Sequence, residues 1–427
     1  MSGARVELGP DGDAQTDAAS DLYQWPLEPG RTATMRSDIA WGATELGTPA
    51  PQAKDLLRIV TAAYIADRTA SQPTQQLARS LGLTVHVERP DAWTQQAQEQ
   101  LVDLLHWLTG DDWALRCVPV GTAANAPRDR LDIDVVAADD ICLLSGGLDS
   151  LCGALVRLRQ PGRAFFLGHA DTSTAVRRAQ QRIQDHLRVT APRHPYVQYA
   201  LRSLDPVRNR TPKTRSLLFM AMAVAAATGT GATRVIVPEN GFTSINPPLE
   251  PSRAGVLTTR STHPWTFHAL TQLLGTIDLR DISVVNPHQD LTKGELLGQA
   301  MPDGTPDDQR LAAQTVSCAK INAGRPKGGD ANTQCGLCVA CLVRRAAFIH
   351  AEMPDLTPYT VSTLPPASSE RVRIVRRHDT DAWRAATSNG IPEHRILGSA
   401  VWPPGTDFDA VLALCERGLK ELARVPV

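Results

Sequence analysis

The chain has 427 residues, of which 42% are hydrophobic and 21% are charged, and its formal net charge is −1. A chain of this length can bury a sizeable core and form two or three domains. The near-neutral charge argues against a protein that binds nucleic acid over a wide basic surface. The longest apolar run, at 217–227, is shorter than the roughly 20 residues that span a bilayer, and no signal peptide is visible. We therefore expect a cytoplasmic protein with no membrane association.

The N-terminal third contains two differently patterned regions. Residues 1–28 are polar, rich in glycine and aspartate and without a period, so we expect a flexible tail. Residues 29–138 combine two helical patterns with two short strand candidates, which predicts an N-terminal α+β domain.

Residues 139–352 alternate strand and helix patterns. The strand candidates lie at 141–145, 163–170, 196–204, 234–241 and 281–287. Such alternation predicts an α/β fold with a doubly wound, Rossmann-like parallel sheet, whose ligands collect at the carboxyl ends of the strands. Residues 353–427 include a basic run and a terminal amphipathic helix, and we expect a C-terminal extension packed on the core or on a partner.

The segment Ser-Gly-Gly-Leu-Asp-Ser, residues 145–150, interrupts an apolar run between the first of these strands and a helix. Two glycines let the backbone approach a ligand closely, and the start of the helix points its N–H groups and positive dipole end into the same hollow. Neither a Walker A loop nor a dinucleotide Gly-x-Gly-x-x-Gly motif is present. The stretch therefore predicts a phosphate site of another kind, and a tight strand-to-helix turn is the alternative.

Four of the eight cysteines form a cluster in the sequence. Cys318 precedes the closely spaced Cys335, Cys338 and Cys341, and four thiolates suffice for a closed, structural zinc site. An iron–sulfur cluster and a disulfide framework are the alternatives, although disulfides are rare in the cytoplasm. We expect the metal to pin a loop beside the sheet.

The 145–150 loop resembles the SGGxDS pyrophosphate loop of the ATP pyrophosphatases, which split ATP between the α and β phosphates. Together with the cysteines that follow it, it resembles the QueC family, the 7-cyano-7-deazaguanine synthases, over about residues 140 to 350. The resemblance implies an adenine nucleotide alpha hydrolase-like fold, ATP, Mg²⁺ and Zn²⁺ as cofactors, and a carbon–nitrogen ligase that adenylates 7-carboxy-7-deazaguanine.

Within that resemblance we assign candidate roles. Catalytic candidates are Ser145, Asp149, Ser150, Arg215 and Lys293. ATP-binding candidates are Leu144, Ser145, Gly146, Gly147, Leu148, Asp149, Ser150, His169 and Asp171. Substrate-binding candidates are Glu239, Asn240, Ser244, Asn246, Arg260, His263 and Arg344, and metal ligands are Cys318, Cys335, Cys338 and Cys341. Structural turns, loop caps and solvated helix ends remain the alternatives for the single polar residues outside the two motifs.

The chain also departs from the family. The acidic substrate segment of the family is replaced by residues 238–265, and the chain is longer at both ends. These features resemble the QueC-like members of the Qat anti-phage defence systems. A chain enlarged at both ends suggests an acceptor larger than ammonia, such as an amine of a partner protein. The alternatives are a synthase of the free precursor, a tRNA-modifying ATP pyrophosphatase, disfavoured by the neutral charge, and a non-catalytic nucleotide sensor.

Overall fold

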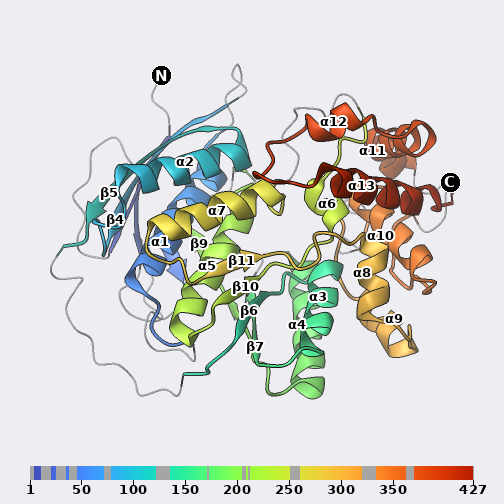
Figure 1. The fold of residues 1–427 in the computed structure, drawn as a ribbon, viewed down its shortest axis with the longest axis horizontal. Coiled ribbons are helices and arrows are strands. Elements are labelled where there is room, and N and C mark those ends of the chain that lie inside the picture. Colours follow the sequence, from blue (N-terminus) through green and yellow to red (C-terminus); the bar gives the residue numbers. More distant parts are fainter. Residues whose placement is uncertain are drawn as a thin grey trace.

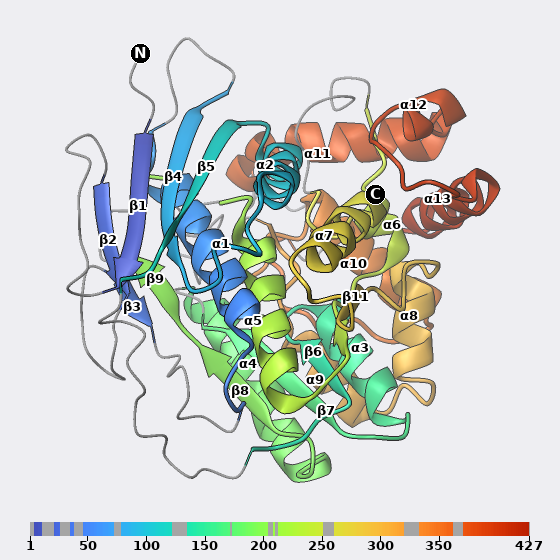
Figure 2. The same ribbon diagram turned by 60° about the vertical axis from the view of Figure 1, so that its left-hand side comes forward.

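The computed structural model shows an α/β chain built on two parallel sheets (Figures 1 and 2). It describes residues 4–10, 21–25, 35–37, 46–71, 78–121, 135–170, 173–203, 208–209, 212–250, 260–319, 333–361 and 370–426. Among the described helices, none combines the length and apolar composition needed to cross a membrane.

The central sheet has five parallel strands in the order β11-β10-β6-β7-β8. The strands are β6 (Asp140–Leu143), β7 (Ala164–His169), β8 (Tyr196–Tyr199), β10 (Arg234–Ile236) and β11 (Ser283–Val285). All five lie where the sequence predicted strands, and the order is consistent with a doubly wound, Rossmann-like fold. Successive strands are added in one direction from β6 to β8, and the chain then returns to place β10 on the other side of β6. The order of strand addition therefore reverses between β6 and β10. Ligands of such sheets bind at this point, beyond the carboxyl ends of the strands.

Both faces of the central sheet are buried. Ile141 and Leu143 of β6 belong to the core on one face, whereas Cys142 and Leu144 belong to the core on the other. This alternation follows from the two-residue period of a strand. The first face is covered by α5 (Arg215–Thr230) and α7 (Pro264–Thr276). The second face is covered by α3 (Leu148–Leu158), α4 (Thr174–Thr190) and α8 (Lys293–Ala300).

The N-terminal region forms a second sheet, in the order β2-β1-β4-β5, in which every pairing is parallel. The strands are β1 (Ala4–Pro10), β2 (Asp21–Trp25), β4 (Ser80–Val87) and β5 (Asp112–Pro119). The expectation of a flexible tail over 1–28 is therefore wrong for residues 4–10 and 21–25. Val6 and Leu8, two residues apart on one face of β1, are buried, and so is Tyr23 of β2, which pairs with Leu8. The all-parallel pairing also makes this region α/β rather than α+β.

Helix α1 (Pro51–Thr69) joins the two sheets into one body. It lies between the N-terminal sheet and α5, as Figure 2 shows, and its residues from Ala53 to Asp67 are almost all buried. Next to it, α2 (Gln95–Thr109) lies beside α7. The short antiparallel pair β3 (Met35–Ser37) and β9 (Leu201–Ser203) makes a further connection. The 29–138 region thus shares a continuous hydrophobic core with the central sheet.

The C-terminal residues form helices that pack on the side of the central region away from the N-terminal sheet (Figure 1). The helices are α11 (Glu370–Asn389), α12 (Glu393–Leu397) and α13 (Phe408–Ala423). Helix α13 contacts α10 (Val339–His350) and the short α6 (Gly241–Ile245), and α9 (Pro306–Ala313) lies at the end of α8 in the figure. Phe242, Leu342, Trp383 and Leu422 form part of the apolar cluster that joins these helices.

Candidate functional site

The 145–150 loop follows β6 at the point where the sheet changes direction. Helix α3 begins at Leu148, and its N-cap Gly147 has no side chain that could cap the first-turn N–H groups. Such N–H groups can bind an anion. Gly146 has a φ of +90°, which favours glycine, and a Cβ at this residue would lie 3.0 Å from Gln180 Cγ. The backbone conformation and the close packing on α4 thus require Gly146.

Two hydroxyl groups lie within the loop. Ser145 Oγ and Ser150 Oγ are 3.3 Å apart, and Ser150 Oγ also donates to the carbonyl oxygen of Gly147 at 2.9 Å. The carbonyl oxygen of Gly146 accepts from Val316 N at 3.0 Å. This last contact ties the loop to the segment that leads into the cysteine cluster.

A cavity of about 640 Å³ lies over the loop. This volume is typical of a small-molecule site. The loop contributes Ser145, Gly146, Gly147 and Ser150 to the lining. The lining also includes cationic and apolar residues, among them Lys213, Arg215, Arg260, Leu108, Phe219 and Met220, together with Glu239.

The N-terminal region orients two of the three cations. Arg260 places its guanidinium carbon 4.1 Å from the ring centre of Trp107 and donates to the carbonyl oxygen of Trp107 at 3.2 Å. Lys213 Nζ donates to the carbonyl oxygen of Thr109 at 2.9 Å. Burial lowers the pKa of Lys213 and of Arg260. Arg215 begins α5, with its guanidinium carbon 5.2 Å from the ring centre of Phe219.

Asp149 lies beneath the loop in a buried charge cluster. Its Oδ2 contacts Lys293 Nζ and accepts from Asn240 Nδ2 at 3.1 Å, and the same amide nitrogen lies 3.3 Å from Glu239 Oε1. Burial acts to raise the pKa of Asp149, but the charge and hydrogen bonds of its neighbours, Lys293 first, leave it lowered. Burial and the Asp149 charge raise the pKa of Glu239 well above its usual value.

One atom of this cluster is unsatisfied. Asp149 Oδ1 is buried and has no hydrogen-bond partner among the described residues. Mg²⁺ prefers ionised carboxylate oxygens, and Asp149 Oδ1 is a buried atom of this kind beside the 145–150 loop.

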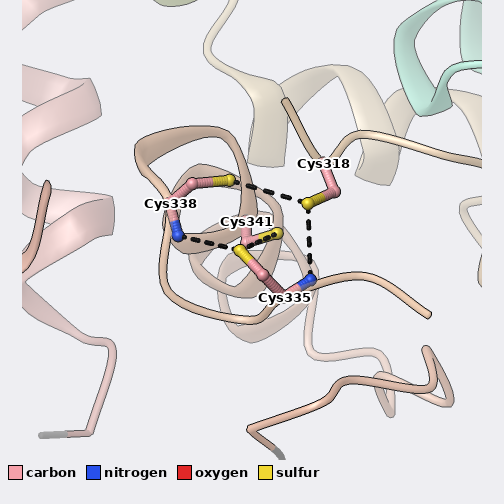
Figure 3. A group of neighbouring side chains, drawn as sticks. All are labelled: Cys318, Cys335, Cys338 and Cys341. Carbon is pink, nitrogen blue, oxygen red and sulfur yellow. Dashed lines mark hydrogen bonds between the residues drawn. The ribbon is translucent and has the colours of Figure 1, made fainter. Parts of the chain in front are cut away.

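The four clustered cysteines come together in space (Figure 3). All four Sγ atoms lie within 4.8 Å of one another, with Cys335 and Cys341 at 3.9 Å and Cys318 and Cys338 at 4.0 Å. Bonds of about 2.3 Å to a tetrahedral metal give Sγ separations of about 3.8 Å. All eight cysteines of the chain are free, and of these four only Cys318 is partly exposed. The group could therefore hold a single metal ion.

Hydrogen bonds join Cys318 to the segment that carries Cys335, Cys338 and Cys341. Gln334 Oε1 accepts from the backbone N–H groups of Ser317 and Cys318 at 3.0 and 3.1 Å. The backbone N–H group of Cys335 donates to Cys318 Sγ at 3.3 Å. Since Val316 bonds to Gly146, a metal here would stabilise a segment that contacts the phosphate loop.

Two predicted substrate residues serve other purposes. Arg344 is fully buried and donates to Thr357 Oγ1 at 2.9 Å, to Thr315 Oγ1 at 2.8 Å and to the carbonyl oxygen of Ala312 at 2.6 Å. It anchors the 312–317 segment and does not line the cavity. His263 is the N-cap of α7, and burial lowers its pKa to about 4.

Other predicted residues also lie away from the cavity. His169 is buried with Nε2 3.2 Å from the carbonyl oxygen of Leu201, Ser244 donates to the carbonyl oxygen of Thr262, and Asn246 ends α6 with a φ of +52°. Leu144 and Leu148 belong to the core beneath the loop. Asp171 is outside the described residues.

Sequence reasoning missed Lys213 and the contribution of α2. Lys213 stands in the Pro-Lys-Thr-Arg sequence directly before Arg215, which was a usable signal because a second cation there shares the same helix start. Leu108, which lines the cavity, and Trp107, which contacts Arg260, carried no such signal, since the packing of α2 on α7 brings them there.

Comparison of the chain with protein-family models, curated proteins and solved structures gave no match. The site itself offers a glycine loop with two hydroxyls, three cationic residues that line the same cavity, a buried carboxyl pair, and a group of four thiols that could hold a metal.

Proposed function

We propose that the protein is an ATP-dependent, QueC-like carbon–nitrogen ligase that adenylates a 7-deazaguanine carboxylate and passes the acyl group to an amine. The observation that carries the proposal is the cavity over the 145–150 loop, whose lining combines the glycines and serines of the loop with three cationic residues. The adenine nucleotide alpha hydrolase-like fold is part of the same proposal.

The loop residues would bind the pyrophosphate portion of ATP. The N–H groups at the start of α3 and the hydroxyls of Ser145 and Ser150 donate to phosphate oxygens, and Arg215 with Lys213 balances their charge. Asp149 would hold Mg²⁺, which when bound would share the phosphate charge. Lys293 keeps Asp149 ionised for this purpose.

The remaining part of the cavity suits a flat heteroaromatic acid. Leu108, Phe219 and Met220 offer apolar contacts, and Arg260 offers a fixed cation for a carboxylate. A carboxylate oxygen attacks the α-phosphorus of ATP, the bond to the β-phosphate breaks, and pyrophosphate leaves. A neutral amine then attacks the acyl carbon, AMP leaves with the bonding electrons, and the nitrogen loses one proton to solvent, which yields an amide.

We further propose that the amine belongs to a partner protein of the same anti-phage defence system. What supports a macromolecular acceptor is that regions on both sides of the catalytic core pack on it, with α2 forming part of the cavity wall. A 7-carboxy-7-deazaguanine-like compound is the proposed acyl donor.

The test is pyrophosphate release from Mg-ATP with and without 7-carboxy-7-deazaguanine, with intact-mass analysis of a co-expressed partner. We expect carboxylate-dependent release and a mass gain on the partner. Ser150→Ala and Asp149→Asn should lower the rate by at least about 100-fold through lost phosphate and metal positioning. The matched control is Asp307→Asn, an exposed carboxylate of α9. A free amide or nitrile as the only product would contradict the protein acceptor, and an absence of release would contradict the ligase.

The cysteine group is proposed to hold Zn²⁺ in a structural role. Metal analysis should find one zinc per chain, and Cys341→Ser should lose it, whereas Cys415→Ser, a buried thiol outside the group, should keep it. Visible absorbance that bleaches on reduction would contradict zinc and indicate iron and sulfur instead.

A further inference from the structure

The start of α8 carries Lys293, the cation that contacts Asp149. Thr292 is the N-cap, and Thr292 and Glu295 form a reciprocal capping box. A capping box satisfies two of the free N–H groups at a helix start with local residues. In this chain an additional acceptor comes from a distant part of the sequence.

That acceptor is Glu421 of the C-terminal helix α13. Glu421 is buried, with 4% of the residue exposed. Its carboxylate accepts from Thr292 Oγ1 and from Gly294 N, the latter at 3.1 Å. His350 Nδ1 of α10 lies 3.3 Å from the same carboxylate. A carboxylate is favoured at a helix N-terminus by the helix dipole. Thr292 and Gly294 flank Lys293, so Glu421 binds the residue on each side of it, one through its hydroxyl and the other through its backbone N–H.

A second contact lies one turn earlier on α13. Arg417 Nε donates to Glu295 Oε1 at 2.8 Å, and its guanidinium also donates to the carbonyl oxygen of Asp290 at 2.7 Å. Side chains four residues apart lie on one face of a helix. This face of α13 therefore contacts the α8 start at two successive turns.

Helix α13 also contacts the other segment that reaches Asp149. Gly418 packs so closely on Phe242 that an added Cβ would overlap the ring. Phe242 is two residues beyond Asn240, whose amide donates to Asp149. One helix of the C-terminal region thus supports both of the residues that hold Asp149.

We propose that Glu421 is a positioning residue, which fixes the start of α8 and thereby keeps Lys293 against Asp149. The effect of Glu421 on catalysis rests on the proposed ligase function, but its effect on the location of Lys293 does not. Errors of about 1 Å in the placement of a catalytic group can cost about 100-fold in rate.

The first experiment measures Lys293 without reference to activity. The protein is treated with a small amine-reactive reagent, and the labelling rate of each lysine is followed by peptide mass spectrometry. In Glu421→Gln we expect Lys293 to react roughly 10-fold faster than in the wild type, because the helix start opens more often. Glu416→Gln, which removes an exposed carboxylate of the same helix, should leave the Lys293 rate unchanged. If Glu421→Gln does not fold, Glu421→Asp replaces it, with a smaller increase expected. An unchanged Lys293 rate overturns the proposal.

The second experiment separates positioning from general stability. At a temperature at which all variants are folded, Glu421→Gln should lower kcat for pyrophosphate release about 10- to 100-fold and leave KM for ATP within about 2-fold. Because Glu421 acts through Lys293, adding Glu421→Gln to Lys293→Ala should cause no further loss. Losses that multiply in the double variant overturn the proposal. A wild type without activity contradicts only the ligase, and the labelling rates then decide the role of Glu421.

Discussion

The N-terminal and C-terminal regions support the cavity in the same manner but with different chemistry. Asp67 of α1 is fully buried and accepts from Thr214 N and Thr214 Oγ1, both at 3.1 Å, immediately before Arg215 begins α5. Glu421 of α13 makes the corresponding contacts immediately before and after Lys293 begins α8. Each region therefore places a buried carboxylate on the start of a helix whose first residue is a cation of the proposed site.

The two carboxylates differ in what balances their charge. Asp67 pairs with Arg79 at 2.6 Å, and Arg79 also pairs with Asp111 at 2.5 Å. Glu421 accepts from a hydroxyl and a backbone N–H group, and its neighbouring titratable groups are His350 and Glu295. Burial raises the pKa of Glu421 despite these hydrogen bonds and His350. The N-terminal contact is thus an ion-pair network, whereas the C-terminal contact depends on a carboxylate that burial makes harder to ionise.

The largest expected effect is the loss of the N-terminal network. Arg79→Ala leaves Asp67 and Asp111 buried without their common cation, and we expect the free energy of unfolding to fall by about 3–5 kcal/mol. Denaturant unfolding measures this change. Arg89→Ala, which removes an exposed ion pair with Asp91, should have a much smaller effect on the free energy of unfolding. Equal effects of the two substitutions would show that the network does not anchor the N-terminal region.

A smaller effect is expected where α13 packs on α6. Gly418→Ala forces a methyl group against the Phe242 ring and should lower the free energy of unfolding by about 1–3 kcal/mol. Gly298→Ala in α8, where an added Cβ meets nothing within 4 Å, should instead stabilise the protein by about 0.5–1 kcal/mol. Thermal unfolding of both variants measures the difference. A neutral Gly418→Ala would mean that α13 is loosely held, contrary to the contacts described above.

The smallest expected effect is a pH dependence that belongs to the C-terminal contact. Because the pKa of Glu421 is raised above its usual value of 4.5, the folded state binds this proton more tightly than the unfolded state. The contribution of Glu421 to stability is therefore largest at pH values below 4.5 and declines as the pH rises through its folded pKa. Unfolding of the wild type and of Glu421→Gln, compared from pH 4.5 upward, should show the wild type losing stability relative to the variant. A parallel pair of curves would contradict a raised pKa.

The sequence predicts those features of the structure that short motifs determine, and it fails for those that depend on contacts between distant residues. The 145–150 loop and the cysteine group are short motifs: the loop lies between a strand and a helix, as its flanking patterns predict, and the four cysteines come together in space. Arg344 and His263 were assigned to substrate because burial and hydrogen-bond partners cannot be read from a single polar residue. The strand pairing of residues 4–10 depends on β4, far along the chain, so a polar segment there looked like a tail.

The burial of α1 on all sides also bears on how the chain is made. Residues 46–71 leave the ribosome long before α5, which covers the outer side of α1 in the finished molecule. At elongation rates of about 5–20 residues per second, an apolar helix face stays uncovered for several seconds during synthesis. The N-terminal region therefore completes its own core only after the chain has passed the phosphate loop, and a nascent chain interrupted before residue 215 would be a substrate for chaperones.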